Sequence, residues 1–546
     1  MFNFGRRIQP KSIQMKHISL FSILLSLLFS LPAASQNPYL PLGECIPDGE
    51  PYVFEDPDHP GSQRVYVYGS HDSMVSGYCG REQVVWSASV DDLLHWRYDG
   101  VIFESKTDAK GNLLHKDGSG DVIYAPDVVE RTLPGGKHVY YLYPNNQEGG
   151  RNTMVCRSDR PDGPFTAINW DKENPQATTG MFGFDPAAFI DSDGRAYGYW
   201  GFGHSCAAEL DTATMSSVKP GTEIVKDMVG GFENDHMFRF YEASSIRKVK
   251  DKYIFIYSRT TNDGEQGLPA SNYTLTYAYS MHPLGPWTYG GTIIDGRALE
   301  HRPDGTFTYT ATPNGNTHGS ICQIKGRWYV FYHRQAGTDE YSRQAMVAPI
   351  DVEVIEGEDG YVKISQAEYT SEGFATDGLN PYTTTPAGLA CYYTGPQGAR
   401  HVWPKVEYSG SHTQVVRQNY KGVANPYDLS LNSCPMVNNT AGSVVGYKYF
   451  NLAHTYGQKH LRFALTYEPE GTAGRIDIML DRPTEGEGGV KIGQIDIPAA
   501  SGTVRTVTTD IDALKHFNGK HALYFVFSSA TKNKSLCKLH SFAVTR

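Results

Sequence analysis

Five residues that can carry out acid–base chemistry occupy matching positions in the first two thirds of the chain. They are Asp48, Asp127, Asp185, Glu242 and His318, and each stands shortly before a Tyr-rich segment. Carboxylates that are brought together shift one another's pKa values, so that one keeps its proton while another ionises. Hydrolysis of a glycosidic bond needs such a pair, an acid to protonate the leaving oxygen and a base to activate water.

The Tyr-rich segments predict the fold that positions these residues. Each follows a turn signal and an earlier short apolar run, so each repeat opens as a strand–turn–strand hairpin. Repeated antiparallel units of this kind are typical of a β-propeller, here with five blades. The first strand of each blade lines the axis, so the five residues would meet in one polar funnel. For any single Asp, the alternative is that it only caps a turn. The segments are 64–70, 138–144, 195–201, 252–258 and 327–333.

The last third of the chain has a different pattern. Short alternating strands are separated by turn residues at 446–450, 460–465, 475–480, 491–495 and 521–527. This spacing indicates a β-sandwich of the jelly-roll type. The predicted fold class is therefore all-β, a five-bladed β-propeller followed by a β-sandwich. We expect the propeller over 36–370, a connecting segment over 371–395 and the sandwich over 396–546.

The first 35 residues have the three parts of a signal peptide. Basic residues precede an apolar run at 18–31, which is too short to span a bilayer, and small residues follow at 32–35. We therefore expect cleavage near residue 35 and a secreted or periplasmic protein without a membrane anchor. The net charge of −10, without a basic block, disfavours nucleic acid as a partner. We expect a monomer.

Several motifs resemble those of glycoside hydrolase family 43 over about residues 37–370. The resemblance implies five-bladed propeller enzymes that remove arabinofuranosyl or xylosyl units with inversion. By motif, Asp48 would be the general base, Asp185 the residue that tunes and orients the acid, and Glu242 the general acid. Glu50 is the alternative base, because the family has Asp followed by Pro where this chain has Asp48-Gly-Glu-Pro. The motifs are Asn37-Pro-Tyr-Leu-Pro41, Ala125-Pro-Asp127, Phe184-Asp-Pro-Ala-Ala-Phe189 with Asp191-Ser-Asp-Gly194, and Glu242-Ala-Ser-Ser-Ile246.

The same resemblance suggests further site residues, each with a structural alternative. Asp127 would contact substrate or support the polar ring, and His318 would bind a structural calcium ion on the axis or bond to a carboxylate without metal. Arg334 would reach sugar hydroxyls or a carboxylate. Trp200 and Phe232 would be sugar-stacking platforms or ordinary core residues.

The function expected from these residues is hydrolysis of plant polysaccharide or oligosaccharide containing arabinose or xylose. We expect an exo-acting α-L-arabinofuranosidase or β-xylosidase. The alternatives are an endo-arabinanase, a galactan-directed relative, or a propeller that binds sugar without catalysis. The sandwich resembles a family 6 carbohydrate-binding module, which would bind the polymer or simply stabilise the propeller.

Overall fold

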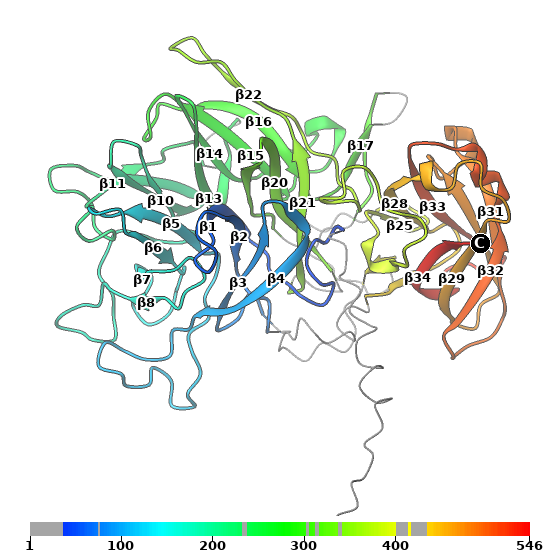
Figure 1. Cartoon of the computed structure of the whole chain (residues 1–546), viewed down its shortest axis with the longest axis horizontal. Helices are drawn as coiled ribbons and strands as arrows, with labels where there is room; N and C mark the ends of the chain where they lie inside the picture. The colour runs from blue at the N-terminus through cyan, green and yellow to red at the C-terminus, as the bar shows by residue number, and fades with distance from the viewer. Residues whose placement is uncertain are drawn as a thin grey trace, which may run out of the picture. The chain divides into compact units, whose positions relative to one another are not determined.

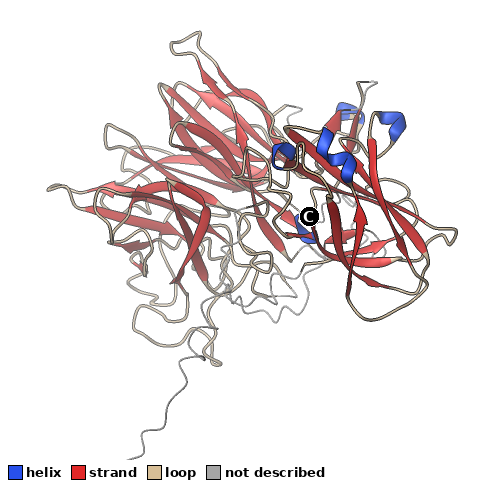
Figure 2. Ribbon diagram, turned by 45° about the vertical axis from the view of Figure 1, so that its right-hand side comes forward, coloured by secondary structure: helices blue, strands red, loops and turns tan. Residues whose placement is uncertain are grey.

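The computed structural model describes residues 36–74, 77–231, 237–301, 305–311, 316–336, 341–399, 413–415 and 434–546. The predicted signal peptide, 1–35, lies outside these ranges. The described residues form β-strands joined by turns and a few 3-10 helices of three to five residues, as Figure 2 shows. None of these helices is long and apolar enough to cross a membrane.

Five antiparallel sheets form the first part of the chain, and in each the strands follow sequence order (Figure 1). Four sheets have four strands and the fifth has three. The second strand of every sheet is one of the predicted Tyr-rich segments. The sheets are β1 (Glu50–Glu55), β2 (Gln63–Gly69), β3 (Gln83–Ser89), β4 (Asp92–Phe103); β5 (Asp127–Thr132), β6 (His138–Tyr143), β7 (Cys156–Ser158), β8 (Thr166–Ala167); β9 (Ala187–Ile190), β10 (Ala196–Phe202), β11 (His204–Leu210), β12 (Val225–Lys226); β13 (Phe240–Val249), β14 (Lys252–Arg259), β15 (Thr274–Ser280), β16 (Thr288–Asp295); and β19 (Ser320–Ile324), β20 (Arg327–Gln335), β21 (Arg343–Ile350).

Each blade buries both faces of its second strand against neighbouring blades. In β2, Val65 and Val67 join a core cluster with Phe331 of the fifth blade, whereas Tyr66 and Tyr68 join a cluster with residues of the second blade. The two-residue period of a strand sends these side chains to opposite faces. The inner strands also contact one another, β5 with β9, β9 with β13, β13 with β19, and β19 with β1. These contacts fit the five-bladed propeller that the repeats predict.

One arginine links the inner strands across the axis. Arg247 of β13 donates to Glu50 Oε2 at 2.8 Å, and to the carbonyl oxygens of Pro51 at 3.1 Å and Ile321 at 3.0 Å. Its guanidinium also lies 4.4 Å from the ring centre of Tyr52, whose hydroxyl donates to Asp127 Oδ1 at 2.7 Å. The other oxygen of Asp127 accepts from the Ala188 N–H of the third blade at 2.7 Å. A single chain of contacts therefore joins all five blades.

Two hairpins precede and follow the fifth blade. The first is β17 (Leu299–His301) with β18 (Phe307–Tyr309), and the second is β22 (Val352–Val354) with β23 (Val362–Ile364).

The last part of the chain is a sandwich of two sheets packed around an aromatic core. Phe463, Phe525 and Phe542 pack there with ring centres 5.0 to 5.6 Å apart. The first two strands, β24 and β25, come from the predicted connecting segment 371–395, so part of that segment belongs to the sandwich sheets. One sheet contains β24 (Thr385–Pro386), β26 (Gln414–Val415), β27 (Met436–Asn439), β29 (Arg462–Pro469), β32 (Arg505–Asp510) and β34 (Cys537–Thr545); the other contains β25 (Tyr392–Thr394), β28 (Val444–Asn451), β30 (Gly474–Leu480), β31 (Val490–Ile497) and β33 (Lys520–Ser528).

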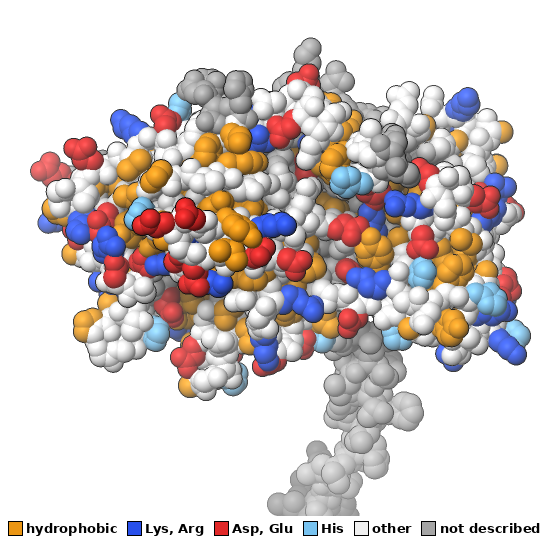
Figure 3. All heavy atoms as spheres, turned by 90° about the horizontal axis from the view of Figure 1, so that it is seen from above, with side chains coloured by type: hydrophobic (Ala, Val, Ile, Leu, Met, Phe, Trp, Pro, Cys, Tyr) orange, Lys and Arg blue, Asp and Glu red, His pale blue; other side chains and the backbone are white. Residues whose placement is uncertain are grey.

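The fifth blade and the sandwich share one hydrophobic core. A single cluster of buried side chains includes Val330 and Tyr332 of β20 together with Phe525 and Phe542 of the sandwich. Arg334, also in β20, donates to the backbone carbonyls of Gly388 and Ala390 just before β25. The described residues accordingly belong to one compact unit. On the face in Figure 3, acidic and basic side chains are interspersed.

Candidate active site

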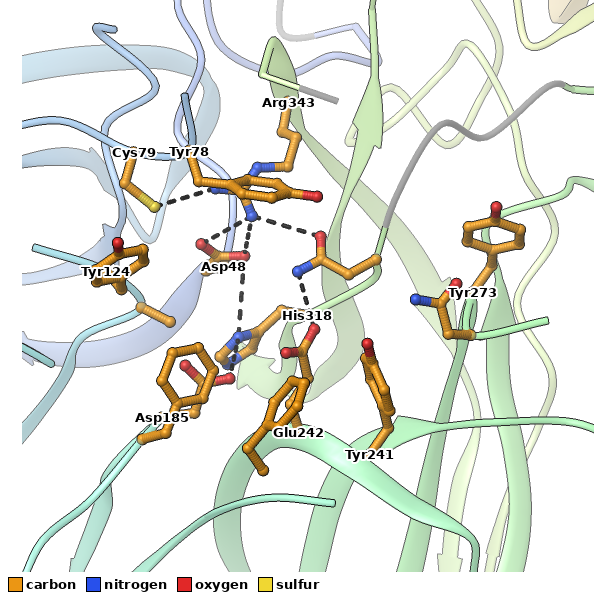
Figure 4. Close-up of a pocket in the computed structure, with 15 residues that line it drawn as sticks. Asp48, Tyr78, Cys79, Tyr124, Asp185, Tyr241, Glu242, Tyr273, His318 and Arg343 are labelled. Atoms are coloured by element: carbon orange, nitrogen blue, oxygen red, sulfur yellow. Dashed lines mark hydrogen bonds and ion pairs between the residues drawn. The ribbon is translucent and has the colours of Figure 1, made fainter. Parts of the chain in front are cut away.

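A cavity of about 330 Å³ is lined by residues at the starts of inner strands, together with residues from the ends of other strands and from loops (Figure 4). Asp48, Asp185, Glu242 and His318 all line it, as predicted. Each is at least nine-tenths buried. The fold therefore brings four of the five predicted residues together from four different blades.

Unusual backbone conformations aim the carboxyl groups into the cavity. Asp48 has φ 60° and Asp185 has φ 49°, both in the left-handed region that non-glycine residues rarely adopt. In a regular strand, Asp48 and Glu50 would point to the same face, because side chains alternate with a period of two. Asp48 lies before β1, so this rule does not apply to it. Glu50 instead pairs with Arg247 and does not line the cavity. The geometry therefore favours Asp48 over Glu50 as the base.

Asp48 is surrounded by hydrogen-bond donors. Arg343 Nη1 lies 2.9 Å from Oδ1 and Ser70 Oγ donates to Oδ2 at 2.5 Å. Burial alone would raise the pKa of Asp48, but Arg343, with His318, His333 and Ser70, outweighs it and holds the pKa below its usual value. Burial lowers the pKa of both imidazoles to about 4, so Arg343 is the cation near neutral pH. Asp48 is therefore ionised, as a base must be.

Glu242 has the opposite electrostatic setting. Burial, reinforced by the charge of Asp48, raises its pKa to about 7, whereas a hydrogen bond from Asn316 Nδ2 to Oε1 at 2.9 Å acts in the other direction. A carboxyl with this pKa holds its proton in mildly acidic to neutral solution, which suits a general acid.

Asp185 lies close enough to Glu242 for each charge to disfavour the other. Burial and the charges of Glu242 and Asp48 raise the pKa of Asp185. Asp185 accepts from Asn145 Nδ2 at 2.8 Å and from the Ala243 N–H at 2.9 Å, and both bonds favour its ionised form. Glu242 accepts only the Asn316 bond among the described residues. These two hydrogen bonds favour a proton on Glu242 rather than on Asp185, and an ionised Asp185 would hold it there by like-charge repulsion.

His318 lies between the two aspartates. Its Nδ1 is 3.7 Å from Asp185 Oδ2 and 3.9 Å from Asp48 Oδ1. Calcium takes about six to eight oxygen ligands. Here Asp48 is already bonded to Arg343, and within the described part of the chain the one cluster with metal-ligand spacing is elsewhere, at His115, Asp121 and Glu148. These side chains do not by themselves make a calcium site, and the calcium prediction at His318 stays a prediction.

Three other predicted binding residues lie away from the cavity, and Phe232 lies outside the described residues. Asp127 bonds Tyr52 and Ala188 on the axis, which supports its structural alternative. Trp200 packs with its ring centre 5.8 Å from that of Phe182, in the core between blades. Arg334 does not fit the predicted sugar contact, because its guanidinium is buried against Gln344 and the Gly388 and Ala390 carbonyls.

Among the cavity residues that the sequence did not reveal, Arg343 and Asn316 contact the predicted carboxylates directly. Arg343 begins the third strand of the fifth blade, a position that no repeat of acidic residues marks. Its guanidinium bridges Asp48 and Asp72, and it lies 5.0 Å from the ring centre of Tyr78. Asn316 stands two residues before His318. His318 was predicted because it stands at the start of a blade. The same criterion could have identified Asn316.

The cavity thus holds a carboxylate with a lowered pKa and a carboxyl with a raised pKa, the pair that hydrolysis of a glycosidic bond requires. The model of the glycosyl hydrolases family 43 matches residues 55–354, and the chain belongs to this family.

Two curated proteins and one solved structure are similar to this chain. A xylosidase/arabinosidase of Thermoclostridium stercorarium is 35% identical over 406 residues, which are 68% of this chain and 77% of that protein. An arabinoxylan arabinofuranohydrolase of Paenibacillus polymyxa is 25% identical over 500 residues, 88% of this chain and 69% of that protein. Among solved structures, a family 43 β-xylosidase/α-arabinofuranosidase from a compost metagenome, in complex with xylotriose and in a calcium-free form, matches with a TM-score of 0.40 and 22% identity, over 59% of this chain and 96% of that one.

Proposed function

We propose that the protein is an inverting, exo-acting glycoside hydrolase that removes α-L-arabinofuranosyl or β-D-xylosyl units from plant polysaccharide or its fragments. The observation that carries this proposal is the electrostatic contrast between Asp48 and Glu242 in one cavity. The names of the two relatives, a xylosidase/arabinosidase and an arabinoxylan arabinofuranohydrolase, support the choice of sugars. The cavity volume of about 330 Å³ supports exo-action, because it is near the lower end of ligand pockets and suits a single sugar unit.

The proposed reaction is a single displacement. Asp48, ionised beside Arg343, accepts a proton from water as the water attacks the anomeric carbon. Glu242 donates its proton to the departing glycosidic oxygen from the other side of the sugar. Asp185 keeps that proton on Glu242 before the reaction. Asp185 also orients Glu242, because it accepts a hydrogen bond from the N–H of the next residue, Ala243. A neutral His318 adds no charge that would compete with these roles, and no step requires a metal.

We further propose that residues 1–35 direct export and are then removed, and that the mature protein acts as a monomer on carbohydrate outside the cytoplasm. The predicted calcium ion would be structural, with His318 as one ligand and water supplying most of the others. N-terminal sequencing of the exported protein tests the cleavage site.

A panel of aryl glycosides tests the activity. We expect hydrolysis of the arabinofuranoside, the xyloside or both, and proton NMR should show the inverted anomer first. Cleavage inside a polymer without release of single sugars would favour endo-action. A retained anomer would overturn the assignment of Asp48 as base.

A further inference from the structure

Phe202 is a large apolar side chain held in the open at the edge of the active-site cavity. It lines the cavity, yet 54% of its surface is exposed. A single exposed apolar side chain is ordinary. Phe202 differs because its ring continues an aromatic surface into the cavity, with ring centres 5.5 Å from Phe184 and 5.1 Å from Tyr241, which also line it.

The backbone fixes Phe202 in this position. Phe202 pairs with His204 across a tight turn at Gly203, between β10 and β11. The Gly203 N–H donates to the Tyr241 carbonyl of the next blade at 2.6 Å. A Cβ on Gly201 would lie 2.0 Å from the His204 carbonyl oxygen, so only glycine fits there. The tip of the hairpin is thus anchored to β13, and the exposed ring is preorganised rather than loose.

The aromatic surface lies on the side of the cavity where Asp185 and Glu242 stand. Phe184 directly precedes Asp185, and Tyr241 directly precedes Glu242. Asp48 and Arg343 lie on the other side, with Tyr78 beside them (Figure 4). In an inverting enzyme the acid and the base stand on opposite sides of the scissile bond, and the leaving group departs beside the acid.

We propose that Phe202 is a specificity-determining residue that stacks on the first sugar of the leaving group, a pyranose that presents a flat face of C–H groups. Xylopyranose, whose ring hydroxyls are equatorial, presents such a face. Burying the exposed phenyl surface under such a ring would contribute binding energy that a leaving group without a ring cannot use. The inference rests on the proposed function, because it takes Glu242 as the acid.

The test compares two substrates of the same accepted sugar. One is an oligosaccharide whose leaving group is xylose, and the other is the glycosyl fluoride of the cleaved configuration, whose leaving group has no ring. We expect Phe202→Ala to lower kcat/KM about tenfold on the oligosaccharide and to leave the fluoride nearly unaffected. Phe202→Trp should retain the oligosaccharide activity. Tyr456→Ala, which removes another exposed aromatic ring (55% exposed) in the sandwich, should change neither rate.

The outcomes separate this inference from the function on which it rests. Equal losses on both substrates, or no loss on the oligosaccharide, would overturn the role of Phe202 while the function stands. A wild-type protein that hydrolyses neither substrate would overturn the proposed function and the inference together.

Discussion

Replacing Glu242 and replacing Asp48 should have different effects on the hydrolysis of different substrates. Glu242→Ala removes the proton donor, so activity should fall severely on oligosaccharides and less on aryl glycosides whose leaving group departs without protonation. General acid catalysis contributes about 10²–10⁴-fold, and the gap between the two substrates should approach that size. Asp48→Ala removes the activation of water, which both substrates need, so both should lose activity similarly.

Steady-state kinetics of both variants on both substrates check this assignment. A selective loss for Asp48→Ala, with equal losses for Glu242→Ala, would mean that the acid and the base are exchanged.

Asn316 should set the upper pH limit of activity through Glu242. Its hydrogen bond stabilises the ionised form and so lowers the pKa of Glu242, which the buried site raises to about 7 overall. Activity should therefore fall as the pH rises through about 7. Asn316→Ala removes the opposing bond, so the pKa of Glu242 should rise and the alkaline limb of kcat/KM should move to higher pH.

The pH profile of Asn272→Ala is the matched control. Asn272 also lines the cavity but has no hydrogen bond to Glu242 in the described structure, so the position of its alkaline limb should stay as in the wild type. A shift to lower pH in Asn316→Ala would contradict the sign of the argument.

Within β20, neighbouring residues serve different parts of the molecule. His333 accepts the Asp48 N–H at 3.3 Å, whereas Arg334 points to the opposite face and bonds the segment before β25. Arg334→Ala would leave the Gly388 and Ala390 carbonyls buried without their donor. The free energy of unfolding should fall by at least about 2 kcal/mol, since each such group costs about 1–3 kcal/mol.

Urea denaturation measures this loss, and kcat/KM measured at a temperature where the variant is folded should be close to that of the wild type. A large rise in KM with unchanged stability would instead restore the predicted sugar contact of Arg334.

The strands that repeat from blade to blade could be predicted from the sequence. Five Tyr-rich strands mark the second strand of every blade, and counting back from them found Asp48, Asp185, Glu242 and His318. Arg343 was not predictable, because its place depends on how the fifth blade packs beside the first. Asp48 and Glu50 could not be separated by alternation, because a left-handed backbone at Asp48 interrupts the strand pattern.

For the whole molecule, the shared core decides whether the propeller can exist alone. A chain that ends near residue 370 would lose the sandwich residues of this shared cluster, and Arg334 would lose the Gly388 and Ala390 carbonyls that it binds. We expect this shortened protein to be insoluble or inactive even on small aryl glycosides. Soluble expression with full activity would instead show that the sandwich is dispensable and serves only to bind polymer.

Arg247, the arginine on the propeller axis, affects how cooperatively the protein unfolds. Proteins built from repeats tend to unfold piece by piece, because each unit contacts only its neighbours. Arg247 contacts the first, fourth and fifth blades directly and reaches the second and third through Tyr52 and Asp127. If any one blade unfolds, the buried Arg247 guanidinium or the chain of contacts around it loses a partner. Propellers with one blade unfolded should therefore be rare. Calorimetry should accordingly show a single sharp transition for the wild type, and Arg247→Met should broaden it by letting individual blades detach.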